Sequence, residues 1–566
     1  MSTVAGGQAY GGAPTHRSIW NRQLTRYPET AQRTVYLGIT VLATVVLYYQ
    51  LYVQGSVATK IIAHFGFTFT QFVFVLVIGN LVGAFASLGA GLADRWGRAN
   101  LVVGGLLVVG LLTLFALPNA SSKAEYTVFF ALVSIVEGMA LVATPALIRD
   151  FSPQIGRASA MAFWTMGPVL GSLAVTEVSS HTLVNHPDWQ FQFRVAGIVG
   201  LVVFAVAAIG LRELSPALRD QLMVSIRDRA LIEARAAGIS EKRLAGNHWL
   251  QMLRPDIVLP ALAISLFLLL YYIFVAFLVV YFATVFGYSA HRANALANWY
   301  WIANVCGLLA AGLLSDRIRV RKPVMIVGTG LSLIAAAIFA SRATHPTTSY
   351  HTFAWVFVLG AVGGGTAYVA WMAAFTETVE KVNPAATATG LAVWGWIIRL
   401  VVTVSFALLP VVVPATSTLV DKGTRVSQIV ATYPQQVQVL GVVDPATLTA
   451  AGAGNRGAQA KAITEISTKL NVPITTAAAR LASVAKVPPA DLAFLSANAA
   501  KVQKAQADNP GQWQTWWWIC FAGQVCLIPA TFLLTGRWSP RKAREDEAEH
   551  EAMVQRELAA LQTART

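Results

Sequence analysis

Two ionisable residues stand near the middle of long apolar runs, where packing alone does not explain a charge. Glu137 lies in the run V-S-I-V-E-G-M-A-L, and Arg399 lies in the run W-G-W-I-I-R-L-V-V. A lone charge at the centre of a bilayer costs at least ~2.5–3.5 kcal/mol, so both side chains must face protein or a water-filled path. We expect them to bind a proton and a solute. A static ion pair that locks two groups of helices together is the alternative.

Aromatic and amide residues recur in several other apolar runs. Small-molecule pockets have such walls, with a few polar groups that fix the orientation of the ligand. For any one of these residues, packing or an anchor at the membrane interface is the alternative. Besides Glu137 and Arg399, the predicted binding residues are Tyr48, Tyr49, Gln50, Trp164, Tyr271, Tyr272, Trp301, Asn304, Trp394 and Trp396.

Charged turns with related sequences occur twice in the chain. Residues 89–101 read G-A-G-L-A-D-R-W-G-R-A-N-L, and residues 312–322 read G-L-L-S-D-R-I-R-V-R-K. Each turn joins two apolar runs, so each marks a place where the chain turns back at one face of a membrane. The repetition predicts a protein that consists of two related halves.

The composition requires that much of the chain faces lipid. Hydrophobic residues make up 55% of the 566 positions and charged residues only 12%, whereas soluble proteins carry about 25% charged residues. The net charge of +15 fits basic turns on the cytoplasmic side of a membrane, so no nucleic-acid partner is expected. The three cysteines lie in apolar runs without metal-ligand spacing and are expected to be packed thiols.

Apolar runs long enough to cross a bilayer occur twelve times. They predict an all-α membrane protein with twelve transmembrane helices in two pseudo-symmetric bundles of six. The runs fall near residues 34–55, 70–92, 100–118, 125–148, 159–180, 193–211, 257–283, 295–315, 323–341, 352–376, 387–413 and 514–535.

The polar segments between the runs complete the expected organisation. Lys and Arg gather on one side, which places both termini in the cytoplasm. Residues 217–236 have the spacing of an amphipathic surface helix. Residues 414–512 precede the last span and show helical patterns at 457–470 and 490–506. They predict a helical extracytoplasmic insertion, with a flexible loop as the alternative. The expected units are a cytoplasmic tail 1–32, a six-helix bundle 33–212, a cytoplasmic linker 213–256, helices seven to eleven 257–413, the insertion 414–512, the twelfth helix 513–536 and a cytoplasmic tail 537–566.

The first charged turn resembles a motif of the major facilitator superfamily, G-x-L-a-D-r-x-G-r-k, which lies between spans two and three. The matching residues are Leu92, Ala93, Asp94, Arg95, Gly97 and Arg98. The resemblance implies two six-helix halves that rock about a central site. It also implies a cytoplasmic latch between the turn and the ends of neighbouring spans, with charges that only set the topology as the alternative. The implied latch residues are Asp94, Arg95, Arg98, Arg149 and Asp150, and in the second half Asp316, Arg317, Arg321, Lys322, Glu377 and Glu380.

Two further stretches resemble the branch of that family with sugar and metabolite:proton symporters. Residues 145–157, P-A-L-I-R-D-F-S-P-Q-I-G-R, resemble its ending of span four, and residues 213–219, E-L-S-P-A-L-R, resemble its P-E-S-P-R motif. Residues 167–172, G-P-V-L-G-S, partly match the G-P-x-x-G-G of proton-driven exporters. The expected function is proton-coupled uptake of a small organic solute, such as a carboxylate bound by Arg399. Proton-antiport efflux of drugs or amphipathic metabolites is the alternative, and a transceptor or scaffold with 414–512 as its partner surface is a second.

Motifs for covalent chemistry are missing from the sequence. It contains no Walker A motif, no H-E-x-x-H and no serine elbow in a suitable setting, so ATP-driven transport and enzymatic activity are not expected. No catalytic residue, metal or cofactor is predicted apart from a proton as the coupling ion. The expected partners are a small-molecule solute and the lipid bilayer, and the protein is expected to be a monomer in the cell membrane.

Overall fold

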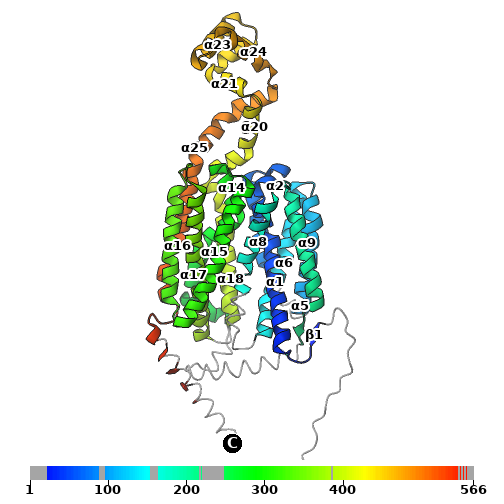
Figure 1. Cartoon of the computed structure of the whole chain (residues 1–566), viewed down its shortest axis with the longest axis vertical. Coiled ribbons are helices and arrows are strands. Elements are labelled where there is room, and N and C mark those ends of the chain that lie inside the picture. Colours follow the sequence, from blue (N-terminus) through cyan, green and yellow to red (C-terminus); the bar gives the residue numbers. More distant parts are fainter. Residues whose placement is uncertain are drawn as a thin grey trace, which may run out of the picture.

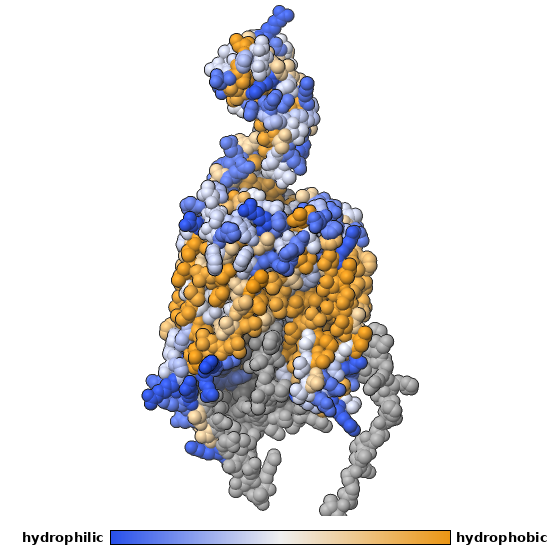
Figure 2. All heavy atoms as spheres, in the orientation of Figure 1, coloured by the Kyte–Doolittle hydropathy of each residue, from blue (hydrophilic) through white to orange (hydrophobic). Residues whose placement is uncertain are grey.

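The computed structural model of the chain describes residues 22–87, 96–152, 164–215, 218, 248–383 and 387–542, and positions 544–545, 548–549, 552–553 and 556. Most of the described part is a bundle of long helices, above which a smaller helical unit projects (Figure 1). A belt of hydrophobic residues covers the middle of the bundle (Figure 2), as a bilayer core requires. We call the end that carries the smaller unit the insertion face, and the opposite end, near β1 (Gln23–Leu24), the terminal face (Figure 1).

The N-terminal half contains the first group of long helices. A serine caps one of these helices: the Ser122 side chain accepts a hydrogen bond from the Glu125 amide at the start of α6. The elements are β1 Gln23–Leu24, α1 Thr30–Ser56, α2 Ala58–Phe65, α3 Phe69–Ser87, α5 Arg98–Leu111, η1 Leu112–Ala116, η2 Leu117–Asn119, α6 Lys123–Phe151, α8 Gly167–Thr182, α9 Trp189–Gly210 and β2 Glu213–Leu214.

The C-terminal half repeats the arrangement. Ser289 and Ser349 cap the first turns of α15 and α17 in the same way. Its elements are α12 His248–Met252, α13 Pro255–Phe267, α14 Leu269–Phe286, α15 Ala290–Ile318, α16 Lys322–Arg342, α17 Tyr350–Val382 and α18 Thr387–Val412, followed after the insertion by α25 Pro489–Val525 and α26 Leu527–Leu533. A break at Leu268 separates α13 from α14 within one predicted span.

Eleven helices of the described residues are long and apolar enough to cross a membrane. They correspond to eleven of the twelve predicted runs. The remaining run, 159–180, begins outside the described residues, and its described part is the 16-residue helix α8. The helical membrane fold is therefore confirmed, and the count of twelve spans stays a prediction. The predicted surface helix at 217–236 lies outside the described residues apart from Leu218.

The two halves meet along three pairs of helices. The helix α1 packs on α14, α8 packs on α15, and α3 packs on α18. In two of these pairs, α3 with α18 and α15 with α8, the second span of one half packs on the fifth span of the other half. A two-fold relation between the halves requires this arrangement. One apolar core joins the N-terminal half to the part of the C-terminal half nearest the insertion face. Near the terminal face a separate core, with Met252, Trp371 and Leu534, contains only residues of the C-terminal half among those described.

The insertion is helical, as predicted. It contains α19 Pro414–Thr418, η4 Leu419–Gly423, α20 Thr424–Thr432, α21 Pro434–Val442, α22 Pro445–Gly452, α23 Arg456–Leu470, α24 Ile474–Ser483 and η5 Val484–Lys486. Two small apolar cores stabilise it. Its last helix does not end at the membrane: α25 runs for 37 residues from the insertion into the bundle, and Pro510 does not interrupt it (Figure 1).

Candidate functional site

A cavity of about 800 Å³ lies between the two halves. The N-terminal half contributes α1, the segment that leads into α8 and the first turn of α8, and the C-terminal half contributes the remaining walls. The lining residues are Tyr48, Trp164, Thr165, Pro168, Val169, Phe267, Leu268, Leu270, Tyr271, Tyr272, Tyr300, Asn304, Ser332, Gly364, Gly365, Tyr368, Trp394 and Gln524. Its walls combine aromatic and apolar side chains with a few polar groups, as the walls of small-molecule sites do.

Two pairs of aromatic rings line the cavity. Tyr271 and Tyr272 follow the break at Leu268, and their ring centroids are 5.2 Å apart. Trp394 of α18 lies 6.3 Å from Tyr368 of α17. Large flat rings of this kind can stack on the apolar faces of a solute.

Three polar side chains of the cavity are held by hydrogen bonds within the C-terminal half. The Ser332 hydroxyl donates to Gln524 Oε1 over 3.2 Å, and both residues are buried. The Asn304 Nδ2 donates to the Ala361 carbonyl over 3.0 Å. These amides and the hydroxyl are fixed in position, so they can orient a bound solute through hydrogen bonds.

Glu137 is a buried carboxyl group of α6. Its side chain is 1% exposed, and among the residues that the structure describes neither carboxyl oxygen has a hydrogen-bond partner. The next residue, Gly138, packs directly on the backbone of Gly83 in α3, where a Cβ atom would overlap the Gly83 carbonyl. This close approach places the carboxyl at the α3–α6 contact, away from water. A buried ionised carboxylate without a partner is unfavourable, so the site favours a protonated state.

Arg399 reaches the same place from the other half. Its guanidinium donates to the Gly83 carbonyl over 3.1 Å, so α18 is linked to α3. The charge of Arg399 acts on Glu137 and on Tyr48, and Tyr48 lines the cavity. In the described side chains no ion pair joins Glu137 to Arg399. Glu137 and Arg399 therefore both lie near Gly83 of α3, but their described side chains do not form the predicted ion pair.

The other predicted binding residues divide into two groups. Trp164, Tyr271, Tyr272, Asn304 and Trp394 line the cavity with Tyr48, and the Trp164 indole donates to Thr144 Oγ1 over 2.9 Å. Four do not line it. Tyr49 and Gln50 are buried in the N-terminal half, Trp301 lines a neighbouring cleft, and Trp396 packs 6.0 Å from Phe85 on the contact of α18 with α3.

Twelve of the eighteen lining residues escaped the sequence analysis, and five of these carry polar groups: Thr165, Tyr300, Ser332, Tyr368 and Gln524. A signal existed for one of them. Gln524 is an amide inside the apolar run C-F-A-G-Q-V-C, and the rule that singled out Glu137 also applies to it. The tyrosines and Ser332 carry no comparable signal, because such residues are common in packed helices.

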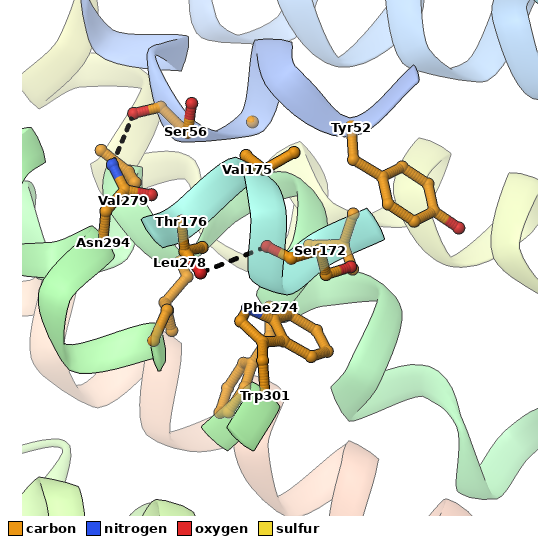
Figure 3. Close-up of a pocket in the computed structure, with 13 residues that line it drawn as sticks. Tyr52, Ser56, Ser172, Val175, Thr176, Phe274, Leu278, Val279, Asn294 and Trp301 are labelled. Atoms are coloured by element: carbon orange, nitrogen blue, oxygen red, sulfur yellow. Dashed lines mark hydrogen bonds between the residues drawn. The ribbon is translucent and has the colours of Figure 1, made fainter. Parts of the chain in front are cut away.

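A smaller cleft of about 300 Å³ lies between the halves nearer the insertion face. Figure 3 shows residues that line it, among them Tyr52 and Ser56 of α1, Ser172 and Val175 of α8, and Trp301 of α15. The Asn294 amide group donates to the Ser56 carbonyl over 2.9 Å and joins the two halves (Figure 3).

Further hydrogen bonds close this side of the interface. His291 of α15 bonds to the Ser180 carbonyl of α8 over 3.1 Å, and Asn298 donates to Glu177 Oε2 over 2.5 Å. The helices also touch by backbone, because a Cβ atom on Gly55 would overlap the Val275 carbonyl. The two halves are thus tightly joined on the insertion face.

The predicted latch in the N-terminal half is an ion pair at the terminal face. Arg98 of α5 donates to both carboxylate oxygens of Asp150 in α6, over 2.8 and 2.9 Å. The Arg98 amide also donates to Glu213 Oε2 over 2.7 Å, so Glu213 caps the start of α5. Asp94, Arg95 and the side chain of Arg149 lie outside the described residues.

The C-terminal half has a matching pair. Arg321 donates to Asp316 over 2.7 Å and to Glu377 of α17 over 3.2 Å. Burial lowers the pKa of Arg321, but the two carboxylates outweigh burial and raise it overall. Glu380 and Arg317 are exposed, and Lys322 is buried near Trp538. Each half therefore has one arginine that ties the start of its third span to the end of its fourth.

Comparisons with known proteins agree with this architecture. The family model of the Major Facilitator Superfamily matches residues 40–396. A bacterial homologue of the human lysosomal transporter Spinster, in an inward-facing and occupied conformation, superimposes with a TM-score of 0.55 at 17% identity over 89% of this chain and 97% of that one. A D-xylose-proton symporter superimposes with a TM-score of 0.52 at 15% identity over 67% of this chain and 89% of that one.

A curated relative is also similar in sequence. The MFS transporter asaE of Aspergillus flavus is 31% identical over 109 residues, which cover 19% of this chain and only 24% of the relative. The apolar helices and the two-halved bundle define a multi-pass membrane protein. The chain belongs to the major facilitator superfamily.

Proposed function

We propose that this protein is a secondary transporter that carries a small organic solute across the cytoplasmic membrane by alternating access, with protons moving in the same direction. The observation that carries the proposal is the Glu137 carboxyl. It is buried, has no hydrogen-bond partner in the described part of the chain, and is close enough to Arg399 of the other half to be affected by its charge.

A proton can couple the two halves at this point. With Glu137 protonated, its carboxyl is neutral and the charged Arg399 guanidinium bonds to the Gly83 carbonyl. Loss of the proton leaves a carboxylate, which attracts the guanidinium and changes the contact between α3 and α18. A group whose protonation alters the contact between the halves alters the balance between their two arrangements.

The cavity supports a solute with both apolar and polar faces. Tyr271, Tyr272 and Trp394 offer ring surfaces, and Asn304 and Gln524 offer amide groups. Arg399 lies outside the lining residues, so it acts on the cavity through its charge. A carboxylate group on the solute would be attracted by that charge.

The distribution of charge supports an orientation with both termini in the cytoplasm. Arginines of the turns, such as Arg98 and Arg321, lie at the terminal face, and cationic turns stay in the cytoplasm. The insertion then lies on the extracytoplasmic side. A proton that moves inward along its gradient would enter from that side.

Efflux by proton antiport is the second candidate. The observation that favours it is the close packing of α8 on α1, where Cβ atoms on Gly167 and Gly171 would overlap Thr44 and Tyr48. The intervening Pro168 lines the cavity. This is the stretch with the exporter-like sequence, and the same carboxyl could couple protons in the opposite direction.

Purified protein in liposomes with an imposed proton gradient tests the proposal. A panel of labelled sugars, organic acids and amino compounds is screened for accumulation against the solute gradient. Symport predicts accumulation on the side toward which protons flow, and antiport predicts accumulation on the other side.

The variant Glu137→Gln separates coupling from transport itself. It should exchange solute across the membrane at a measurable rate and accumulate none, because an amide cannot take up a proton. Glu125→Gln is the matched control, since Glu125 is an exposed residue of the same helix. Full accumulation by Glu137→Gln would remove this carboxyl from the mechanism.

A further inference from the structure

The base of the insertion is fixed to the C-terminal half by buried hydrogen bonds. The Thr416 hydroxyl donates to Asn509 Oδ1 over 2.6 Å and accepts from the Trp513 indole over 2.8 Å. Asn509 and Trp513 belong to α25, and all three residues are fully buried. Asn509 also donates to the Thr284 carbonyl near the end of α14 over 3.3 Å. The segment α19–η4 is therefore tied to two spans of this half.

Apolar packing strengthens the same attachment. Ala415, Leu419 and Val426 of the insertion share one small core with Leu495 and Val502 of α25. Since α25 continues into the bundle as a single helix, the base of the insertion must move with the C-terminal half.

One residue of this base bonds to the other half. Asp421 Oδ1 accepts a hydrogen bond from the Phe69 amide over 2.8 Å, although the residues are 352 positions apart. Phe69 is the first residue of α3, and the first amides of a helix have no partner within it. Thr68 and Gln71 cap each other at the same helix end. Asp421 supplies an acceptor to an amide that this local pair leaves open, at the positive end of the helix.

The bond lies over a dry aromatic contact. The Phe69 ring is 5.9 Å from Phe277 of α14, and Phe277 is 5.2 Å from Phe406 of α18. The three rings are at most 3% exposed. A side chain from the insertion thus holds the end of α3 where the two halves seal the insertion face.

We propose that Asp421 is a clamp of the transport cycle: the insertion holds α3 against the C-terminal half, and this bond must break before the cavity opens to the insertion face. The inference rests on alternating access, the motion of the proposed function, and not on the identity of the solute or on coupling to protons. It gives the insertion a role that the resemblance to the family does not supply.

The chemistry around the clamp sets its strength. Partial burial raises the pKa of the Asp421 carboxyl, and the Phe69 amide, Lys422 and Lys123 oppose this rise without cancelling it. Lys422 comes from the same turn, and Lys123 from the start of α6. Removal of a carboxylate cap shifts a helix equilibrium by about two- to thirtyfold, so the ratio of closed to open protein should change by a factor in this range.

Labelling of a cysteine in the interface measures the opening. Val175 is 3% exposed and lines the cleft between the halves (Figure 3). Val175→Cys is introduced after Cys306, Cys520 and Cys526 are changed to alanine. A membrane-impermeant maleimide is then added to sealed vesicles of either orientation, and the labelling rate is measured without solute or proton gradient.

The expected order of labelling rates from the insertion face is fixed by the hydrogen bond. Asp421→Ala removes the acceptor and should label about two- to thirtyfold faster than the parent. Asp421→Asn keeps an oxygen that accepts the Phe69 amide and should label no faster than the parent. Asp421→Glu moves the carboxylate by one methylene and should fall between the parent and the alanine variant.

A matched control separates the clamp from general loosening of the insertion. Asp444 caps α22 within the insertion by accepting from the Thr447 amide over 3.1 Å, and this bond does not cross between the halves. Asp444→Ala should label like the parent. Equal rates for Asp421→Ala and the parent, or equal acceleration by Asp444→Ala, would overturn the proposal. Neither result depends on whether Glu137 carries the coupled proton.

Discussion

Gly97 should be the most sensitive glycine of the terminal face. Its backbone has φ 91° and ψ 136°, which residues with a Cβ atom rarely adopt. A Cβ atom there would overlap Glu213 Oε1, and that side chain has little room to move because it is 1% exposed. Gly97→Ala should therefore strain the backbone and also displace the cap that Glu213 provides to the Arg98 amide.

The magnitude follows from these two effects. Backbone strain costs about 1–3 kcal/mol, and loss of a cap costs about 0.5–2 kcal/mol. Gly66→Ala is the matched control, because Gly66 has φ 63° but no atom within 4 Å of the added Cβ. The control suffers only the milder strain of the left-handed helical region, so the difference between the variants combines the extra backbone strain at Gly97 with the loss of the cap. We expect Gly97→Ala to be less stable than Gly66→Ala by about 1 kcal/mol or more.

Thermal unfolding in detergent measures this difference. Tryptophan fluorescence at one fixed heating rate reports the apparent Tm of the parent and of both variants. A difference of 1 kcal/mol corresponds to about 2–4 °C in a domain of 150–250 residues. If Gly97→Ala melts at or above the temperature of Gly66→Ala, the role assigned to Glu213 is wrong.

Two further predictions concern the buried Glu137 carboxyl and the Asp421 clamp. Gly138→Ala should abolish solute accumulation in the liposome assay, because its Cβ atom would push α6 away from the Gly83 carbonyl and shift Glu137. Gly104→Ala is the control and should transport normally, because no atom lies within 4 Å of the added Cβ atom. The clamp should tighten in acid. Burial raises the pKa of Asp421 above its ordinary value of 3.8, so the closed state binds a proton more tightly than an open state with a hydrated carboxyl. Closure is then favoured most below the ordinary pKa, and the gain is lost as pH rises through the raised pKa. Cysteine labelling from the insertion face, normalised at each pH to Asp421→Asn, should slow as the pH falls; a ratio that does not change with pH would contradict this sign.

The spans were predictable because lipid leaves few alternatives. A backbone in hydrocarbon must satisfy its own hydrogen bonds, so an apolar run of sufficient length becomes a helix. Their ends were less predictable: α15, capped by Ser289, begins at Ala290 and not at the predicted 295. The charged turns were also informative: Arg98 and Asp150, grouped by the family motif, lie within 2.8 Å of each other.

The walls of the cavity were less predictable. A helix in a membrane is apolar on all sides, so its pattern does not show which side faces the cavity. Tyr48 and Tyr49 are neighbours in α1, yet one lines the cavity and the other is buried within the N-terminal half. The bond between Asp421 and Phe69 depends on the path of the whole insertion, and no local pattern of sequence encodes it.

The unbroken course of α25 has a mechanical consequence. At 1.5 Å per residue, its 37 residues form a rod of about 55 Å that is anchored in the bundle at one end and in the insertion at the other. A tilt of about 10° at the buried end would carry the far end through about 10 Å. A molecule that binds the insertion would therefore exert a force on the bundle through α25. A probe attached to the insertion would report small tilts of α25 inside the bilayer as larger displacements.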